Sequence, residues 1–175
     1  EFVLPSPLVE IGEEIRDYAA GFFAGDRPFL SAVRALTQTI FRDFRYDTTF
    51  SDVSTPIREV FAHRRGVCQD FAHLAIACVR SAGFAARYVS GYLETLPPPG
   101  REKLVGSDAS HAWFAVYSPG EGWFEFDPTN DQLAGHQHIV TAWGRDYADV
   151  APLRGVLFGG GEKHRLQVSV DVSRV

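Results

Sequence analysis

The chain has 175 residues, of which 45% are hydrophobic and 13% aromatic, so it can fold around one core and is too apolar for a disordered chain. Its formal net charge of −5 argues against a general nucleic-acid binder, which would present a basic face. No apolar run approaches the roughly 18 residues of a membrane helix, and no signal-peptide pattern opens the chain. We therefore expect one domain over residues 1–175, located in the cytoplasm, with neither nucleic-acid nor membrane partners; the oligomeric state stays open.

The sequence contains two cysteines and no methionine. Because even an initiator Met is missing, we expect the chain to be a fragment that lacks an upstream domain. If Cys68 and Cys78 lie on one helix, their ten-residue separation corresponds to roughly 15 Å. A disulfide requires Cα atoms within about 7 Å, so we expect two free thiols, which fits a reducing cytoplasm.

The first half of the chain is predicted to be helical. After an extended stretch that contains prolines, residues 8–23 are typical of a helix, and Pro28 begins a second one. Thr55 and Pro56 are typical of the N-cap and first position of a short helix that ends at about Ala62. The predicted buried face of the second helix consists of Leu30, Val33, Thr37, Ile40, Phe41 and Phe44.

A longer helix begins with the first cysteine. Its apolar residues form one wide stripe, so we expect the helix to be largely buried and to stop at Gly83. Asp70, in its first turn, would favour the helix start through the dipole and a hydrogen bond back to the backbone. The stripe consists of Cys68, Phe71, Ala72, Leu74, Ala75, Ile76, Cys78, Val79 and Ala82.

After this helix the hydrophobic pattern changes to strict alternation. Residues 86–94, 111–117 and 122–127 are predicted strands, and the last two would form a hairpin around "SPGE". We expect the polar loop 95–109 to form one wall of a substrate cleft, and a final strand near residues 165–172. Helices followed by an antiparallel sheet indicate an α+β fold.

The predicted hairpin brings a histidine and an aspartate together. If its turn is centred on Pro119, His111 lies directly opposite Asp127, with Cβ atoms about 4.5–5.5 Å apart. A two-residue slip would leave the pair diagonal and within reach, whereas a one-residue slip would put the two side chains on opposite faces. The carboxylate could then orient the imidazole and stabilise the imidazolium.

With Cys68, this pair would make a complete nucleophilic system. Cys68 would attack a carbonyl carbon, His111 would take its proton and return one to the leaving amine, and Asp127 would orient His111. The helix N-terminus and the imidazolium would both favour the thiolate. The backbone N–H of Cys68 is a candidate oxyanion donor, and Tyr46 or the side chain of Gln69 is a candidate for a second.

Each residue also has an ordinary structural interpretation. Cys68 alone could be a structural thiol, His111 a core histidine, and Asp127 a cap of the turn in "DPTND". Trp113 could shield the site or stack on substrate, although core packing is the simpler interpretation. Cys78, in the middle of the apolar stripe, should be inert. Only the combination favours catalysis.

Three motifs in this order, "GVCQDFAHL", "SHAWFAVY" and "GWFEFDPTN", resemble the transglutaminase-like superfamily, in particular bacterial members described as candidate cysteine proteases. The resemblance covers about residues 30–165. In that family a Cys begins a helix, a His lies in an H-A-W strand and an Asp in a D-P-T strand, which correspond here to Cys68, His111 and Asp127. The resemblance implies a papain-like fold with an antiparallel sheet packed on the cysteine helix, and related proteins often carry a further N-terminal β-rich domain.

The residues and the resemblance together predict an acyl-transfer enzyme that uses no cofactor and no metal. Its thioester on Cys68 would be resolved by water in a protease or amidase and by an amine in a transglutaminase. We favour hydrolysis, because transfer requires an amine site that excludes water and the sequence shows no signature of one, nor an Asp-rich Ca²⁺ loop. The expected substrate is a peptide, a protein or a small amide.

Three alternatives remain open. An arylamine N-acetyltransferase shares the residue order, but its motif fits poorly around Cys68. A binding or scaffold domain with an unused triad would have an unreactive Cys68. A metal site could use His136 and His138, which share a face if they lie on a strand. His63 and His73 lie nearby in the sequence, but nothing completes a zinc pattern, so solvated loop histidines are the simpler interpretation.

Overall fold

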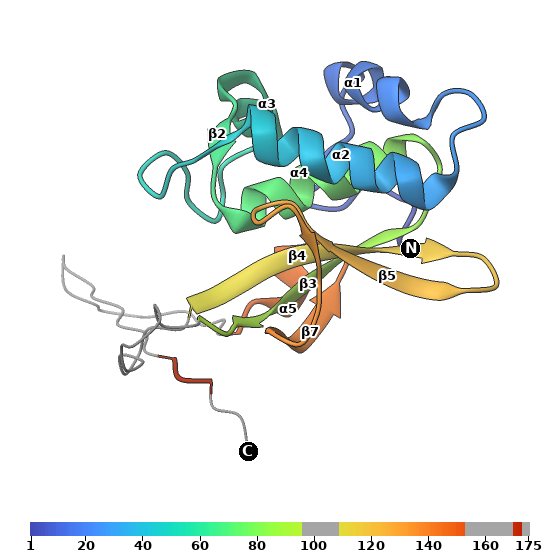
Figure 1. Cartoon of the computed structure of the whole chain (residues 1–175). Helices are drawn as coiled ribbons and strands as arrows, with labels where there is room; N and C mark the ends of the chain where they lie inside the picture. The colour runs from blue at the N-terminus through green and yellow to red at the C-terminus, as the bar shows by residue number, and fades with distance from the viewer. Residues whose placement is uncertain (96–108, 153–169, 173–175) are drawn as a thin grey trace.

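A layer of helices covers one face of an antiparallel sheet in the computed structural model of the chain (Figure 1), as expected for an α+β fold. The structure describes residues 1–95, 109–152 and 170–172. None of the helices in these ranges is long and apolar enough to cross a membrane. The helices are α1 (Glu13–Phe23), α2 (Phe29–Asp43), α3 (Ile57–His63), α4 (Cys68–Ser81) and α5 (Tyr147–Val150), and the strands are β1 (Arg45–Tyr46), β2 (Arg65–Gly66), β3 (Ala86–Leu93), β4 (Ala109–Ser118), β5 (Gly122–Asp127), β6 (Gln132–Leu133) and β7 (His138–Gly144).

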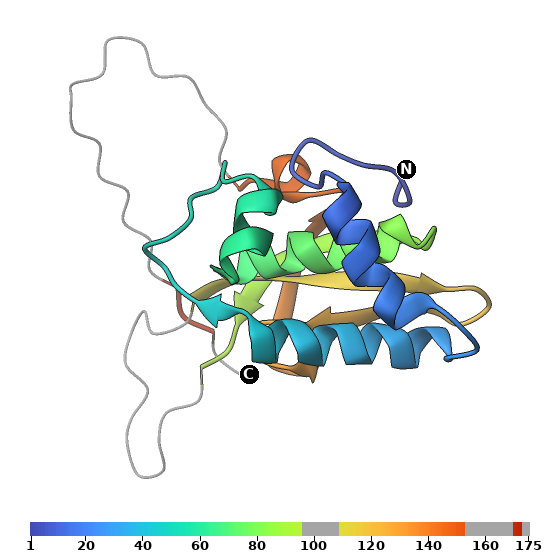
Figure 2. The ribbon, with the colours of Figure 1, turned by 90° about the horizontal axis from the view of Figure 1, so that it is seen from above.

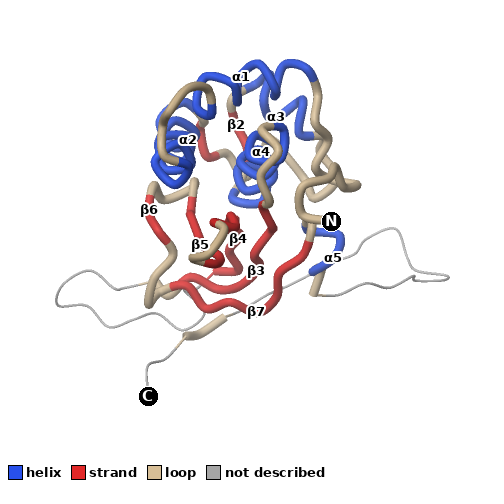
Figure 3. Tube along the Cα trace, turned by 90° about the vertical axis from the view of Figure 1, so that its right-hand side faces the viewer, coloured by secondary structure: helices blue, strands red, loops and turns tan. Residues whose placement is uncertain are grey.

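The main sheet has the strand order β6-β5-β4-β3-β7, and every neighbouring pair in it is antiparallel. The short strands β1 and β2 form a separate parallel pair. Seen from above, α1, α2 and α3 surround α4 (Figure 2), and seen along the sheet, α4 lies between the sheet and α1 (Figure 3). The cysteine helix is therefore the central helix of the domain.

Burial of α4 follows from its apolar composition. Every residue from Asp70 to Arg80 is buried, which confirms the prediction of a largely buried helix. The helix ends at Ser81, and Gly83 follows with φ +86°, a left-handed conformation that favours glycine. Hydrophobic residues of β3 and β4, among them Tyr88 and Phe114, pack in the same core cluster.

The predicted helices agree with the structure within a few residues at most boundaries. The first helix begins at Glu13 rather than at residue 8, and Phe41 is 50% exposed instead of lying on the buried face of α2. Pro56, not Thr55, is the N-cap of α3, and the Thr55 hydroxyl does not cap the helix but accepts a hydrogen bond from the backbone N–H of Asp52. The loop expected to line the cleft and the expected last strand lie almost entirely outside the described residues.

The β4–β5 hairpin is centred on Gly120, so the predicted register around Pro119 was wrong by two residues. Ser118 pairs with Gly122, which leaves a three-residue loop. Gly120 and Gly122 have positive φ values, +85° and +102°, and the turn that they form is centred one residue later than expected. Moving the centre of a hairpin by one residue shifts the cross-strand pairing by two. Because the register differs by an even number, His111 and Asp127 remain on one face of the sheet as a diagonal pair.

A β-bulge interrupts the pairing of β7 with β3. Ser90 pairs with Ala142, but the next residue, Gly91, pairs with Val140, so Thr141 is an additional residue in β7. One additional residue reverses the faces to which the following side chains of that strand point. The first half of β7 therefore presents its side chains differently from an unbroken strand.

Gly91, next to this bulge, should not tolerate a side chain. A Cβ atom there would collide with the carbonyl oxygen of Ile139 and lie 2.7 Å from the indole of Trp113. We expect Gly91→Ala to lower the free energy of unfolding by on the order of 3 kcal/mol. Urea unfolding measures this, with Gly135→Ala as the control, since a Cβ at Gly135 meets nothing within 4 Å. Equal stability of the two variants would contradict the prediction.

Candidate active site

Cys68 is the first residue of α4 and is half-buried, so its thiol lies at the positive end of the helix dipole. The Asp70 side chain accepts a hydrogen bond from the backbone N–H of Val67 at 2.8 Å, as predicted for a residue that supports the helix start. Gly66 makes room for it, because a Cβ at Gly66 would lie 2.6 Å from the Asp70 carboxylate. The "GVC" segment thus has a structural reason for its glycine.

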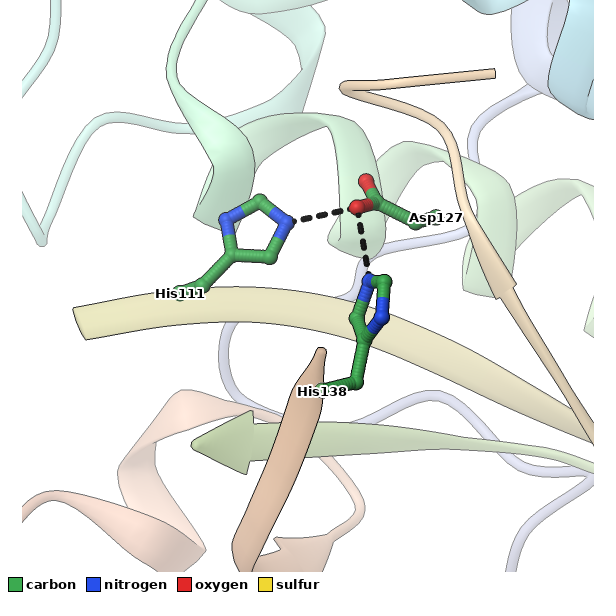
Figure 4. Close-up of side chains that lie close together, drawn as sticks. All are labelled: His111, Asp127 and His138. Atoms are coloured by element: carbon green, nitrogen blue, oxygen red, sulfur yellow. Dashed lines mark hydrogen bonds and ion pairs between the residues drawn. The ribbon is translucent and has the colours of Figure 1, made fainter. Parts of the chain in front are cut away.

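His111, in β4, is buried and connects two parts of the site. Its Nε2 atom lies 2.8 Å from Oδ2 of Asp127 (Figure 4), which leaves Nδ1 for the hydrogen bond with Cys68. Burial acts to lower the pKa of His111, but the hydrogen bonds and charges of Asp127 and Cys68 outweigh it and raise that pKa to about 9. The structure therefore favours an imidazolium at this position.

Asp127, the last residue of β5, is fully buried and surrounded by donors. Its Oδ1 accepts hydrogen bonds from the backbone N–H groups of Thr129 and Asn130, at 2.9 and 3.2 Å. Its Oδ2 bonds to His111 and His138 and accepts a third bond, at 2.7 Å, from the Asn130 amide. Burial acts to raise the pKa of Asp127, but these hydrogen bonds and the charge of His111 hold it well below its usual range.

The two interpretations of Asp127 are therefore both correct structurally. One oxygen caps the turn that follows β5, and the other binds the imidazole of His111. The turn fixes the carboxylate, so the structural role supports the contact with His111.

Trp113 is fully buried, so its indole packs against the site and does not form part of an exposed substrate surface. The ring stacks on His111 with centroids 5.9 Å apart, and its edge contacts His138 with centroids 5.1 Å apart. Its Nε1–H donates a 2.8 Å hydrogen bond to Glu125. Trp113 is therefore a core residue, as the simpler interpretation expected, and its ring also covers one face of the His111 imidazole.

The two candidates for a second oxyanion donor differ in their positions. The side-chain amide of Gln69 donates to the carbonyl oxygen of Val53 at 3.2 Å, so it is engaged elsewhere. Tyr46 is 53% exposed, and burial together with the negative charge of Cys68 raises the pKa of its hydroxyl. Tyr46 is therefore the candidate that lies near the thiol.

The second cysteine differs from the first, as expected. Cys78 lies in the core with no exposed surface, and burial raises the pKa of its thiol. A buried neutral thiol is a poor nucleophile. Cys78 therefore serves as an internal reference for the reactivity of Cys68.

The four histidines considered for a metal site do not gather. His63 and His136 are exposed, and His73 is buried, where its Nε2 accepts a hydrogen bond from the backbone N–H of Tyr147. His138 is not a solvated loop histidine, because its side chain is only 3% exposed and bonds to Asp127.

His111, Asp127 and His138 do form, among the described residues, a group whose ligand atoms lie within 4.8 Å of one another, as metal ligands would. Hydrogen bonds explain why these three side chains lie close together. The backbone N–H of Gly135 donates to Nδ1 of His138 at 3.2 Å, which leaves the proton of a neutral ring on Nε2, facing the carboxylate. A metal ion would require an unprotonated nitrogen there. We therefore interpret the group as a hydrogen-bonded network.

A sequence profile of the transglutaminase-like superfamily matches residues 16–128, which is more than half of the chain. The chain belongs to the transglutaminase-like superfamily. The matched segment extends from α1 to the residue after Asp127, and it contains Cys68 and His111 in the order that the resemblance implied. The predicted family and the predicted fold class are thus confirmed.

Several proteins resemble this superfamily member over different lengths. An uncharacterized Mycobacterium tuberculosis protein is 48% identical over 176 residues, which are 98% of this chain and 56% of that protein. The crystal structure of a Cytophaga hutchinsonii protein described as a candidate cysteine protease is 32% identical with a TM-score of 0.71, and the match covers 86% of this chain and 48% of that chain. A Pseudomonas aeruginosa protein-glutamine gamma-glutamyltransferase is 38% identical over 71 residues, or 40% of this chain and 11% of that protein. The chain thus spans about half the length of the M. tuberculosis protein.

Sequence reasoning missed two residues of the network in this superfamily member, His138 and Asn130. Asn130 follows Asp127 by three residues, a spacing at which a turn brings the two side chains together. The signal for His138 was weaker, since its place beside Asp127 depends on the β7 bulge.

The raised pKa of His111 predicts a loss of stability at alkaline pH. The folded protein holds this proton with a pKa of about 9, against 6.5 for an ordinary histidine. The stabilisation is therefore fully present below pH 6.5 and is lost as the pH rises through 9. We expect the free energy of unfolding to fall by up to ~1.4 kcal/mol per pH unit more steeply in the wild type than in His111→Gln.

Urea unfolding at several pH values across this window measures the difference. His136→Gln removes an exposed histidine two residues from His138 and should behave as the wild type. The same pH dependence in the wild type and His111→Gln would show that His111 holds no additional proton in the folded state.

Proposed function

We propose that this protein is a cysteine-dependent acyl-transfer enzyme that cleaves amide bonds through a thioester on Cys68. The observation that carries the proposal is the position of the His111 imidazole, with Nε2 on the buried carboxylate of Asp127 and Nδ1 left for Cys68. This is the arrangement in which a thiol is activated by a base that a third group orients. The resemblance to the Cytophaga hutchinsonii protein supports a cysteine protease or amidase.

In the first half of the reaction, the Cys68 thiolate attacks the carbonyl carbon of the amide. The tetrahedral oxyanion collapses, the carbon–nitrogen bond breaks, and the His111 imidazolium gives its proton to the departing amine. The product is a thioester on Cys68 and a neutral His111. Asp127 stays ionised throughout and holds the ring in one orientation.

In the second half, water attacks the thioester while His111 accepts one of its protons. The carbon–sulfur bond breaks, a carboxylic acid leaves, and the proton remains on His111, which restores the thiolate–imidazolium pair. The oxyanion of both halves would accept hydrogen bonds from the backbone N–H of Cys68 and the hydroxyl of Tyr46.

Transfer to an amine is the second candidate. The similarity to the Pseudomonas aeruginosa protein-glutamine gamma-glutamyltransferase favours it, since the same thioester would then be resolved by an amine. That similarity covers 40% of this chain, whereas the Cytophaga hutchinsonii structure covers 86%. We therefore place hydrolysis first, with a peptide, a protein or a small amide as the proposed substrate.

Iodoacetamide labelling tests the nucleophile directly. We expect Cys68 to label at about pH 6, where an ordinary thiol with a pKa near 8.5 is almost entirely protonated. Cys78, which is buried, should label only after unfolding, and His111→Ala should slow labelling of Cys68 at pH 6 by on the order of a hundredfold. Mass spectrometry of tryptic peptides separates the two cysteines.

Equal labelling of Cys68 and Cys78 in the folded protein would refute the proposal and favour a binding domain. If Cys68 is reactive, a peptide library scored for new amino termini and for incorporated amine distinguishes hydrolysis from transfer. Cys68→Ala should abolish both products, and Cys78→Ala should leave them unchanged, because Cys78 does not reach the site.

The proposed oxyanion contact predicts a selective kinetic effect for Tyr46→Phe. Loss of one donor to the oxyanion should lower kcat by on the order of a hundredfold and change KM little, because the contact forms mainly in the transition state. Tyr117→Phe is the control, since Tyr117 lies at the far end of β4, beside Trp123. An unchanged kcat for Tyr46→Phe would exclude Tyr46 as the donor.

A further inference from the structure

We propose that His138 is a positioning residue, which donates a hydrogen bond from Nε2 to Oδ2 of Asp127 and holds this oxygen in line with His111. This inference rests on the proposed function, because it assigns a fourth residue to the same site. His138 does not contact substrate and acts only through Asp127.

The hydrogen bonds of His138 define its tautomer. Its Nδ1 accepts the backbone N–H of Gly135 at 3.2 Å, and its Nε2 lies 3.0 Å from Oδ2 of Asp127. A neutral imidazole that accepts at one nitrogen carries its proton on the other. His138 is therefore a donor to the carboxylate, and a dashed line in Figure 4 marks this contact.

The β7 bulge is the reason that this side chain faces the site. After the bulge Leu93 pairs with His138, and without it Leu93 would pair with Ile139. The bulge thus turns His138 to the face of the sheet that carries His111 and Asp127. Bulges are frequent beside active sites because they redirect a side chain in this manner.

Packing restrains the ring further. The His138 side chain is 3% exposed, and the edge of Trp113 contacts it with centroids 5.1 Å apart at an angle of 79°. The same indole stacks on His111. Trp113 therefore contacts both imidazoles, and both rings reach the same carboxylate oxygen.

The hydrogen bond from His138 to Asp127 has a consequence for catalysis. The turn holds the carboxylate through three hydrogen bonds, two to Oδ1 and one to Oδ2, and any remaining rotation about the Cβ–Cγ bond would move Oδ2 away from the His111 ring. The His138 donor, which approaches the same oxygen from β7, further limits rotation of the carboxylate. Because alignment of the base controls proton transfer, a loosened Asp127 should lower kcat and change KM little.

The test compares a donor and a non-donor at position 138. His138→Gln places an amide N–H near the position of Nε2, whereas His138→Leu keeps an apolar contact with Trp113 and donates nothing. We expect His138→Leu to lower kcat and the rate of Cys68 labelling at pH 6 by about tenfold, and His138→Gln to restore both to within about threefold of the wild type. His136→Leu is the matched control, because His136 is exposed.

Equal rates for His138→Leu and the wild type would overturn the inference. If His111→Ala still slowed labelling by about a hundredfold in the same experiment, the proposed function would stand. Equal losses in His138→Leu and His138→Gln would also overturn it, because packing and not donation would then matter. If the wild-type Cys68 itself does not label at pH 6, the proposed function fails first, and the positioning role fails with it.

Two further measurements use the wild-type protein and need no variant. Nitrogen chemical shifts of the His138 ring in the wild type should show the proton on Nε2, and a proton on Nδ1 would overturn the inference. Stoichiometric zinc in the purified protein would also overturn it, since His111, Asp127 and His138 would then be ligands.

Discussion

A buried aspartate that must stay ionised is the constraint on which the site depends. Asp127 has no exposed surface, and an unpaired carboxylate in such a place would take up a proton. Five hydrogen-bond contacts prevent this, two from the turn after β5, one from the Asn130 amide and one from each of two imidazoles. The negative charge then has one strong partner, His111, whose pKa it raises. The hairpin, the turn and β7 thus share one electrostatic function.

Apolar packing keeps the two halves of the site together. Cys68 belongs to a helix, and the other residues belong to a sheet that begins almost twenty residues later, so nothing in the local chain holds them at contact distance. The buried side of α4 packs on β3 and β4 in one core cluster, which fixes the helix start beside the start of β4. Arg80 strengthens this arrangement, since its buried guanidinium donates to carbonyl oxygens of the first residues and of the segment after β7.

Much of this could be predicted from the sequence, and the rest could not for definable reasons. The period of the apolar residues was sufficient for α2, α4 and the hairpin strands. The register of the hairpin was wrong by two residues, because two glycines with positive φ moved the turn. His138 was interpreted as a loop histidine, because its orientation depends on a bulge that the alternation of β7 does not reveal.

By itself, the sequence determined the α+β order of elements, the family, and three residue types in motifs that single out Cys68, His111 and Asp127. These features are local, since they follow from hydrophobic period, turn residues and short motifs. Only the tertiary structure decided that Trp113 is buried against two imidazoles, that Gln69 is engaged elsewhere, and that His138 faces Asp127. Those outcomes depend on packing between strands distant in the chain and on one additional residue in β7, which no local pattern encodes.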